Sequence, residues 1–178
     1  MAQSTGRRST AKTIAMYLVA VVLLMMASYA FLVPREGSVI AGPIDAYQRF
    51  QATAVAFLLG KILPVTSEND TLLVDGDPLI VGYACTGLDA LIIYLSVLIP
   101  FPLRLAPKLL GIALGILLSV VLNVLRISAL VVVYRIDRSA FTFAHVHLLP
   151  LVVVVAHILL FVRVALVSRA PGAASPAS

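Results

Sequence analysis

The sequence contains one cysteine, Cys85, in the stretch 81–89, where a polar segment meets an apolar one. A lone thiol cannot form an internal disulfide, so it either packs as a small apolar side chain or acts as a nucleophile. Gly87 follows two residues later and would let another backbone approach closely. Asp89 could orient an imidazole, pair with an arginine, or serve as an ordinary acid in the first turn of a helix.

Further polar side chains lie inside apolar stretches later in the chain. Asn123 and Arg126 are one helical turn apart, and burying a charge in a membrane segment costs at least about 2.5 kcal/mol on insertion scales, which favours a functional role for Arg126. His145 and His147 open the last apolar stretch, where an imidazole could transfer protons. This pair alone is too weak a pattern to predict a metal site. His157 lies deeper and is interpreted as a packing residue.

The composition places these residues in a membrane. The chain is 61% hydrophobic and 12% charged, and its mean hydropathy is +1.08. Soluble domains are roughly half apolar and a quarter charged, so we expect an all-α integral membrane protein. One cysteine excludes a disulfide framework, a paired-cysteine redox motif and a multi-thiolate metal site. The net charge of +5 does not indicate nucleic acid, because basic residues gather at the cytoplasmic ends of membrane segments.

The apolar stretches predict a bundle of about four transmembrane helices around a single catalytic domain, 14–168. The predicted spans are 14–33, 86–101, 109–134 and 141–167. The polar ends 1–13 and 169–178 are interpreted as a cytoplasmic tail and a disordered tail. A cleaved signal peptide is the alternative for the first apolar stretch, although its length favours an uncleaved anchor.

Two segments between the first and second spans are of another kind. Residues 44–63 have apolar side chains at helical spacing among charged ones, which favours an amphipathic helix on the membrane surface over a fifth span. Residues 71–82 alternate around Asp75-Gly76-Asp77 and predict a short β-hairpin. This hairpin would deliver Cys85 to the next membrane segment.

The basic residues predict the topology. With four spans, Arg104, Lys108 and both termini share one side, which the positive-inside rule makes cytoplasmic. Arg126 would then lie about 27 Å along its helix from Lys108, near the extracytoplasmic boundary. Cys85 and His145 begin their helices at the same level, and the helix dipole would favour a Cys85 thiolate.

These motifs carry a resemblance to a known family. The stretch Ala84-Cys85-Thr86-Gly87-Leu88, then Asn123-Val124-Leu125-Arg126-Ile127, then a histidine heading the last span, resembles the exosortase/archaeosortase family of membrane transpeptidases. The resemblance covers roughly 71–161. Thr86 stands where serine is commoner, and the chain is shorter than the exosortases linked to exopolysaccharide. Of the two histidines, His145 is favoured over His147 because it follows a Phe-x-x-Ala lead-in.

The resemblance implies a sortase-like mechanism without a cofactor. Cys85 would attack a peptide carbonyl in a C-terminal sorting signal and form a thioester. His145 would move protons, and Arg126 would stabilise the oxyanion or hold the substrate in register, with Asn123, Asp89 and Gly87 supporting them. The implied partners are membrane-anchored proteins with a tripartite C-terminal signal, and a lipid or an amine as acceptor.

Two functions of other classes, transport and membrane assembly, also fit the sequence. A small transporter would also place arginine and histidine inside the membrane, but it would not need an extracytoplasmic thiol. A membrane assembly subunit would need none of the three polar groups.

Overall fold

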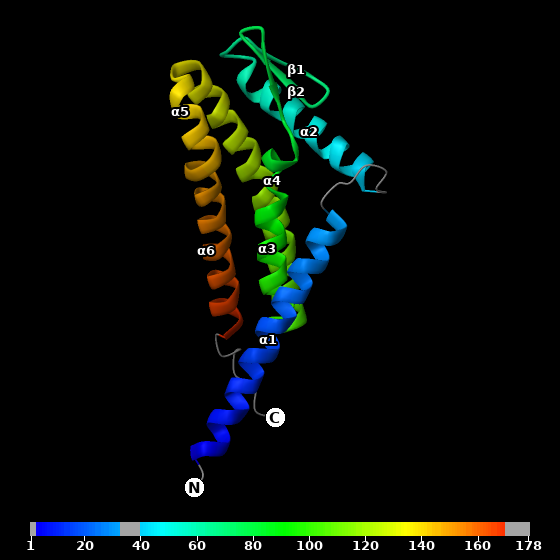
Figure 1. Cartoon of the computed structure of the whole chain (residues 1–178), viewed down its shortest axis with the longest axis vertical. Helices are drawn as coiled ribbons and strands as arrows, with labels where there is room; N and C mark the ends of the chain where they lie inside the picture. The colour runs from blue at the N-terminus through cyan, green and yellow to red at the C-terminus, as the bar shows by residue number, and fades with distance from the viewer. Residues whose placement is uncertain (1–2, 33–39, 170–178) are drawn as a thin grey trace, which may run out of the picture.

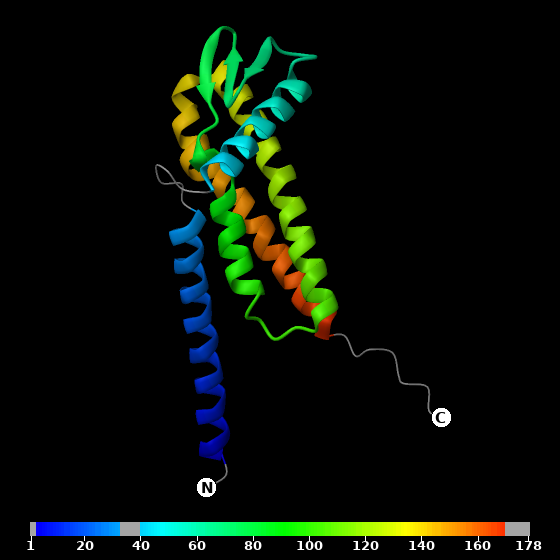
Figure 2. The same cartoon turned by 90° about the vertical axis from the view of Figure 1, so that its right-hand side faces the viewer.

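Helix α4 (Leu105–Ile136) is the longest element, and most of the other elements are arranged along it (Figure 1). The computed structural model describes residues 3–32 and 40–169. Helices α3 (Leu88–Leu98) and α6 (Leu149–Arg169) lie alongside α4, and α1 (Gln3–Leu32) contacts α3. Helix α2 (Ala41–Leu59) and a small sheet cover the end of the bundle opposite the N-terminus (Figure 2).

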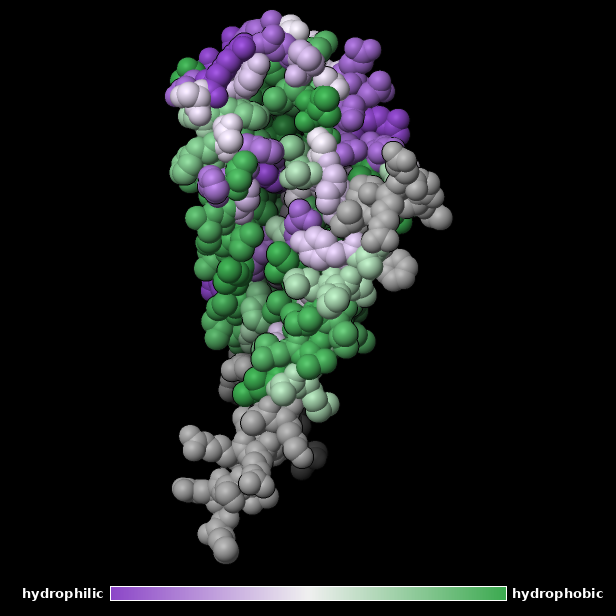
Figure 3. Space-filling model, viewed as in Figure 1, coloured by the Kyte–Doolittle hydropathy of each residue, from purple (hydrophilic) through white to green (hydrophobic). Residues whose placement is uncertain are grey.

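The expectation of an all-α integral membrane protein is confirmed. Within the described ranges, three helical stretches are long and apolar enough to cross a membrane: Thr13–Ala30, Leu105–Ile136 and Arg138–Ser168. On the face that Figure 3 shows, apolar side chains cover the helices of the bundle, whereas polar ones gather at the end that carries the sheet. This distribution fits a bundle whose sides face lipid and whose capped end faces water.

Helices α1 and α3 differ most from their expected bounds. Helix α1 begins at Gln3, so most of the segment interpreted as a polar tail is helical. Helix α3 covers 11 residues rather than 86–101, because Gly87 has a left-handed φ of 71° before it and Pro100 and Pro102 follow it. At about 1.5 Å per residue, α3 alone spans about half of a bilayer core of about 30 Å. The remainder of the tail predicted at 169–178, from residue 170 on, lies outside the described residues.

A stripe of small residues on α4 sets how closely α3 approaches. Gly111, Gly115, Ser119 and Asn123 recur every fourth residue and are all buried. A Cβ at Gly115 would overlap the Tyr94 ring, and the Tyr94 hydroxyl donates a 2.8 Å hydrogen bond to the Gly111 carbonyl. Small residues at this spacing let membrane helices pack backbone to backbone. The stripe therefore fixes the register of α3 on α4.

The sheet contains the two expected strands and one more. Strands β1 (Val65–Glu68), β2 (Thr71–Val74) and β3 (Asp77–Ile80) pair antiparallel in that order. Asp75 and Gly76 join β2 to β3 with φ values of 52° and 91°, the backbone of a two-residue hairpin turn that suits an Asp-Gly pair. Val81 directly follows β3 and is buried, and the chain continues from it into the turn that holds Cys85.

Charged groups anchor the hairpin tip to the end of α4. Arg135 pairs with Asp75 at 2.7 Å, and Arg138 at the start of α5 (Arg138–Phe143) pairs with Asp77. The Tyr134 hydroxyl donates to Asp77 Oδ2 at 3.1 Å. These exposed contacts orient the sheet above the bundle, and the apolar core between α2, the sheet and α4 supplies the larger stabilisation.

Helix α2 has two faces of different character. One face packs into the fold and contains Ile44, Gln48, Gln51, Ala52, Val55 and Leu59. The apolar positions that predicted an amphipathic helix include Phe50 and Phe57, which are 52% and 69% exposed. Within the described chain, α2 is not among the helices long and apolar enough to span a membrane. We therefore propose that α2 lies at the membrane surface, with its exposed phenylalanines toward the lipid.

We predict that Gly115→Ala destabilises the protein, although alanine is intrinsically the better helix former by about 1 kcal/mol. The new methyl group must displace the hydrogen-bonded Tyr94 ring, and overpacking of this kind typically costs about 1–3 kcal/mol. Thermal unfolding in detergent would show a lower Tm. Gly42→Ala is the matched control, because a Cβ there meets no atom within 4 Å. Equal Tm values for both variants would contradict the packing account.

Candidate functional site

Cys85 lies at the end of η1 (Tyr83–Cys85), a single 3₁₀ turn between the sheet and α3. The Cys85 N–H donates to the Gly82 carbonyl at 2.8 Å, and the Thr86 hydroxyl donates to the Tyr83 carbonyl at 2.7 Å. Helix α3 begins three residues later, at Leu88. The expectation that Cys85 begins this helix is therefore wrong, and the thiol lies outside the first turn, where the helix dipole is felt most.

Gly87 makes the sharp passage from this turn into α3 possible. Its φ of 71° lies in the left-handed region that glycine adopts at little cost. A Cβ at this position would lie 2.8 Å from Asn123 Oδ1 and 3.3 Å from Asn123 Cβ. Gly87 is therefore required both by its backbone conformation and by its closeness to α4.

Asn123 connects the cysteine turn to two helices. Its side-chain amide donates to the Cys85 carbonyl and, at 2.9 Å, to Gln51 Oε1 on α2. Gln51 Nε2 donates in turn to the Thr86 carbonyl at 3.2 Å. Asn123, Gln51 and Thr86 are all fully buried. In such a site each of these hydrogen bonds is costly to lose, so the network holds the Cys85 backbone in one position.

Gln51 was missed at the level of the sequence. The hydrogen bond from Asn123 joins residues 72 positions apart, and the pattern of 44–63 indicates only a surface helix or a fifth span, with no partner for Gln51. A signal was available, because Gln48 and Gln51 interrupt the apolar positions of one face of that helix. Glutamine on an otherwise apolar helix face indicates a buried polar partner elsewhere in the fold.

Arg126 is 8% exposed and reaches from α4 to the last helix, where its Nη2 donates to the His145 carbonyl at 3.3 Å. That carbonyl is free because η2 (Ala144–Leu148) is a π-helical turn, in which the Leu149 N–H bonds to the Ala144 carbonyl. The next hydrogen bond of the same i to i+5 type would run from the Pro150 N–H to the His145 carbonyl, but proline has no N–H. Pro150 thus leaves an acceptor that anchors the arginine.

The two candidate histidines differ in environment. The His145 ring stacks on Phe141 with centroids 5.7 Å apart, and its buried Nδ1 has no hydrogen-bond partner among the described residues. His147 is exposed and rests against Phe143. The structure thus brings His145 to Arg126 and leaves His147 on the outside. No group of three or more potential metal ligands occurs in the described part of the chain.

The environment of the thiol corrects a second expectation. Burial raises the pKa of Cys85 above its usual value, and the nearby Arg126 guanidinium and the hydrogen bond with Gly82 lower it by less. The arginine acts in the expected direction, but desolvation is the larger effect. The direction of this shift favours the neutral thiol over the thiolate at neutral pH.

Asp89 is held by a tyrosine rather than by an ion pair. The Tyr83 hydroxyl donates to Asp89 Oδ1 at 3.5 Å, and Tyr29 of α1 lies near this carboxylate. Burial, followed by the charge of Asp89, raises the pKa of Tyr83 to about 12. Within the described ranges the ion pairs are those of Arg135 and Arg138, so Arg126 and Asp89 are not in direct contact.

A cavity of about 180 Å³ opens beside this site, and we call it the Arg126 cavity. Its walls come from η1, α3, α4 and α6. The lining residues are Ala84, Gly87, Asp89, Ala90, Ile93, Arg126, Pro150, Val153 and Val154. The residues on either side of Cys85 and the guanidinium thus face one space, at the end of the bundle that carries the sheet. An acyl group bound there would lie next to both the thiol turn and a fixed positive charge.

The comparisons with known proteins give one result. The family model described as transmembrane exosortase matches residues 6–162, which is most of the chain. Comparison with curated proteins and comparison with solved structures give no match.

We predict that Cys85 reacts with the neutral reagent iodoacetamide with a pH midpoint above that of a free thiol, which is about 8.5. Arg126→Gln should move this midpoint further up, because it removes the charge that lowers the pKa of the thiol. Arg126→Lys and Arg135→Gln are controls and should leave the midpoint near that of the wild type. Cys85 is the only cysteine, so intact mass reports its alkylation directly. A midpoint that Arg126→Gln does not move would contradict the assignment.

Proposed function

Because this chain belongs to the transmembrane exosortase family, we propose that it cleaves a C-terminal sorting signal of membrane-anchored proteins through a cysteine thioester. The observation that carries the proposal is the convergence of three elements on one place. The turn that holds Cys85 bonds to Asn123 of α4, and Arg126, one turn along α4, bonds to the His145 carbonyl in the π turn of the last helix. Arg126 also lines a cavity together with Ala84 and Gly87 of the cysteine turn.

In the proposed acylation step, His145 removes the thiol proton as Cys85 Sγ attacks the scissile carbonyl carbon. The tetrahedral intermediate collapses when its C–N bond breaks, and the histidine returns the proton to the leaving amine. A neutral resting thiol favours this order, because a base must act at the moment of attack. Water, an amine or a lipid hydroxyl then attacks the thioester carbonyl carbon and transfers its proton to His145. The C–S bond breaks, and the histidine returns the proton to the Cys85 sulfur.

In the proposed reaction, the positive charge of Arg126 stabilises the oxyanion. One of its nitrogens is fixed on the His145 carbonyl, while its Nε has no partner among the described residues. A guanidinium held in this way is available to the negative charge that develops on the carbonyl oxygen. Asn123 acts differently: it positions the Cys85 backbone and does not need to contact the substrate.

The proposed orientation puts the site at the extracytoplasmic face. The sheet end of the bundle is polar (Figure 3), and the opposite end carries Arg104 and Lys108. Basic residues mark the cytoplasmic ends of membrane segments. Both termini would then be cytoplasmic, and the substrate would present its cleavage site where its membrane anchor emerges from the lipid.

We predict that Cys85→Ala and Cys85→Ser abolish processing of C-terminally anchored proteins in the native host. His145→Ala should slow processing by about 10²–10⁴-fold, the usual contribution of a general acid–base group. His147→Ala is the matched control and should process at nearly the wild-type rate, because this side chain is exposed away from Arg126. Immunoblotting of the shortened protein measures each variant. Normal processing with Cys85→Ala would exclude the mechanism and favour a transporter or an assembly subunit.

A cysteine at an exposed position tests the orientation. In a Cys85→Ser background, Ile80→Cys on β3, where Ile80 is 67% exposed, should react with a membrane-impermeant maleimide added to intact cells. Arg104→Cys in the same background should react only after the membrane is permeabilised. The reverse pattern would place the hairpin in the cytoplasm and overturn the proposed topology.

A further inference from the structure

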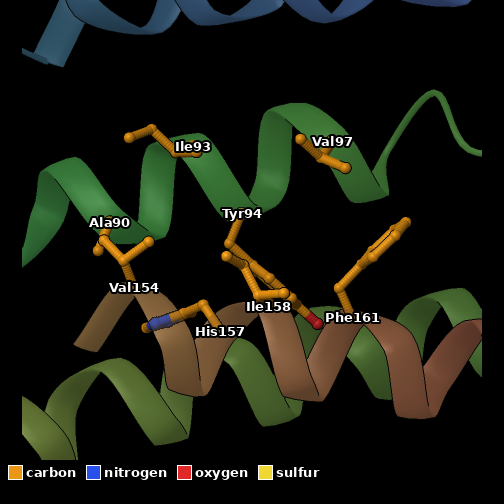
Figure 4. A pocket seen from close by; sticks show the side chains of 8 residues that line it. All are labelled: Ala90, Ile93, Tyr94, Val97, Val154, His157, Ile158 and Phe161. Carbon is orange, nitrogen blue, oxygen red and sulfur yellow. The ribbon is translucent and has the colours of Figure 1, made fainter. Parts of the chain in front are cut away.

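A second cavity continues from the Arg126 cavity toward the other end of the bundle. This inner cavity has a volume of about 80 Å³ and lies between α3 and α6 (Figure 4). It shares Ala90, Ile93 and Val154 with the Arg126 cavity, so the two form one path along the helices. We call this path the α3–α6 groove.

The groove is open to the lipid side of the bundle. Ile93 on α3 and Ile158 on α6 line it and are 42% and 55% exposed. An apolar cavity of about 150 Å³ accommodates a benzene molecule. The Arg126 cavity, at about 180 Å³, therefore has room for a large side chain, and the inner cavity, at about 80 Å³, has room for a small one. Small residues at Ala84, Gly87 and Ala90 line the wall nearest the thiol. Such a groove suits the side chains of a helix lying against it in the membrane.

The inner cavity contains a polar atom that has no hydrogen-bond partner in the described part of the chain. His157 is 3% exposed and lines the inner cavity (Figure 4), and its Nδ1 lies 2.8 Å from the Val153 carbonyl. A carbonyl can only accept, so Nδ1 carries the proton and Nε2 of the neutral ring is an acceptor. Nε2 is buried and has no hydrogen-bond partner within residues 3–32 and 40–169, although the Tyr94 ring lies 5.3 Å from the imidazole. The Tyr94 hydroxyl cannot serve, because it donates to the Gly111 carbonyl.

We propose that the α3–α6 groove binds the transmembrane helix of the protein substrate, and that His157 Nε2 accepts a hydrogen bond from a serine or threonine hydroxyl on that helix. The inference rests on the proposed function, because a polypeptide cleaved at Cys85 must continue from the Arg126 cavity into the membrane. The backbone N–H groups of a helix are already bonded, so the donor is a side chain, and a serine or threonine hydroxyl is small enough for a cavity of about 80 Å³. His157 follows His145 by 12 residues, so the hydroxyl would lie about 18 Å below the cleaved bond.

A synthetic transmembrane peptide tests the groove. The peptide has a leucine–alanine span of about 20 residues, one serine about 12 residues into it and a basic C-terminal tail. The full-length protein in nanodiscs carries a photoreactive benzoylphenylalanine at Ile93. The matched control carries it at Leu117 on α4, which is 59% exposed and does not line the groove. We expect peptide cross-links from Ile93 well above those from Leu117.

The serine dependence identifies the role of His157. Replacing the peptide serine by alanine should lower the Ile93 cross-link yield about threefold, the usual effect of one hydrogen bond within a membrane. His157→Leu should lower the yield of the serine peptide equally and remove the difference between the two peptides. The serine-to-alanine change leaves the protein intact, so it remains informative if His157→Leu fails to fold.

Two results would overturn the inference: equal yields for the serine and alanine peptides, or equal yields from Ile93 and Leu117. Cross-linking of Ile93 to lipid, unchanged by added peptide, would also overturn it and assign the groove to lipid. The assay needs no cleavage. Serine-dependent cross-linking without Cys85-dependent processing would therefore sustain the groove and contradict only the catalytic proposal.

Discussion

The buried carboxamide of Asn123 is the interaction on which the arrangement of the site depends. Its amide group donates to the Cys85 carbonyl and to Gln51, while its oxygen side lies against Gly87. These contacts join α4, α2 and the turn before α3 at one point. Because Asn123, Gln51 and Gly87 are buried, a partner lost at these groups is costly to replace. The position of the thiol is therefore set by a side chain on another helix.

The helix packing brings Asn123 to that point. The glycine and serine stripe on α4 holds α3 close, in a register that puts Gly87 opposite Asn123 and Tyr94 opposite Gly115. One turn further along α4, Arg126 reaches the carbonyl that Pro150 leaves without an N–H partner. A π-helical turn at a functional site is a common arrangement. Here the His145 carbonyl stays free for Arg126 because Pro150 has no N–H to donate to it.

Much of the fold could be predicted from the sequence, because membrane helices follow hydropathy. Counting residues along the helices also predicts that Cys85, Arg126 and His145 lie at a common depth. The rest depended on contacts that leave no local pattern. Gln51 joins the site across 72 residues, and the third strand, β1, has few apolar residues to reveal it. The raised pKa of Cys85 reflects burial in three dimensions, which the position of a residue along a helix cannot show.

If Cys85 carries the acyl group, as we propose, its thioester can be trapped and identified. The protein purified from its native membranes should include a fraction covalently linked to a cleaved polypeptide, detected by intact mass. Neutral hydroxylamine should release that polypeptide, and the Cys85→Ala chain should carry none of it. An adduct that survives hydroxylamine, or one that persists in Cys85→Ala, would contradict the account.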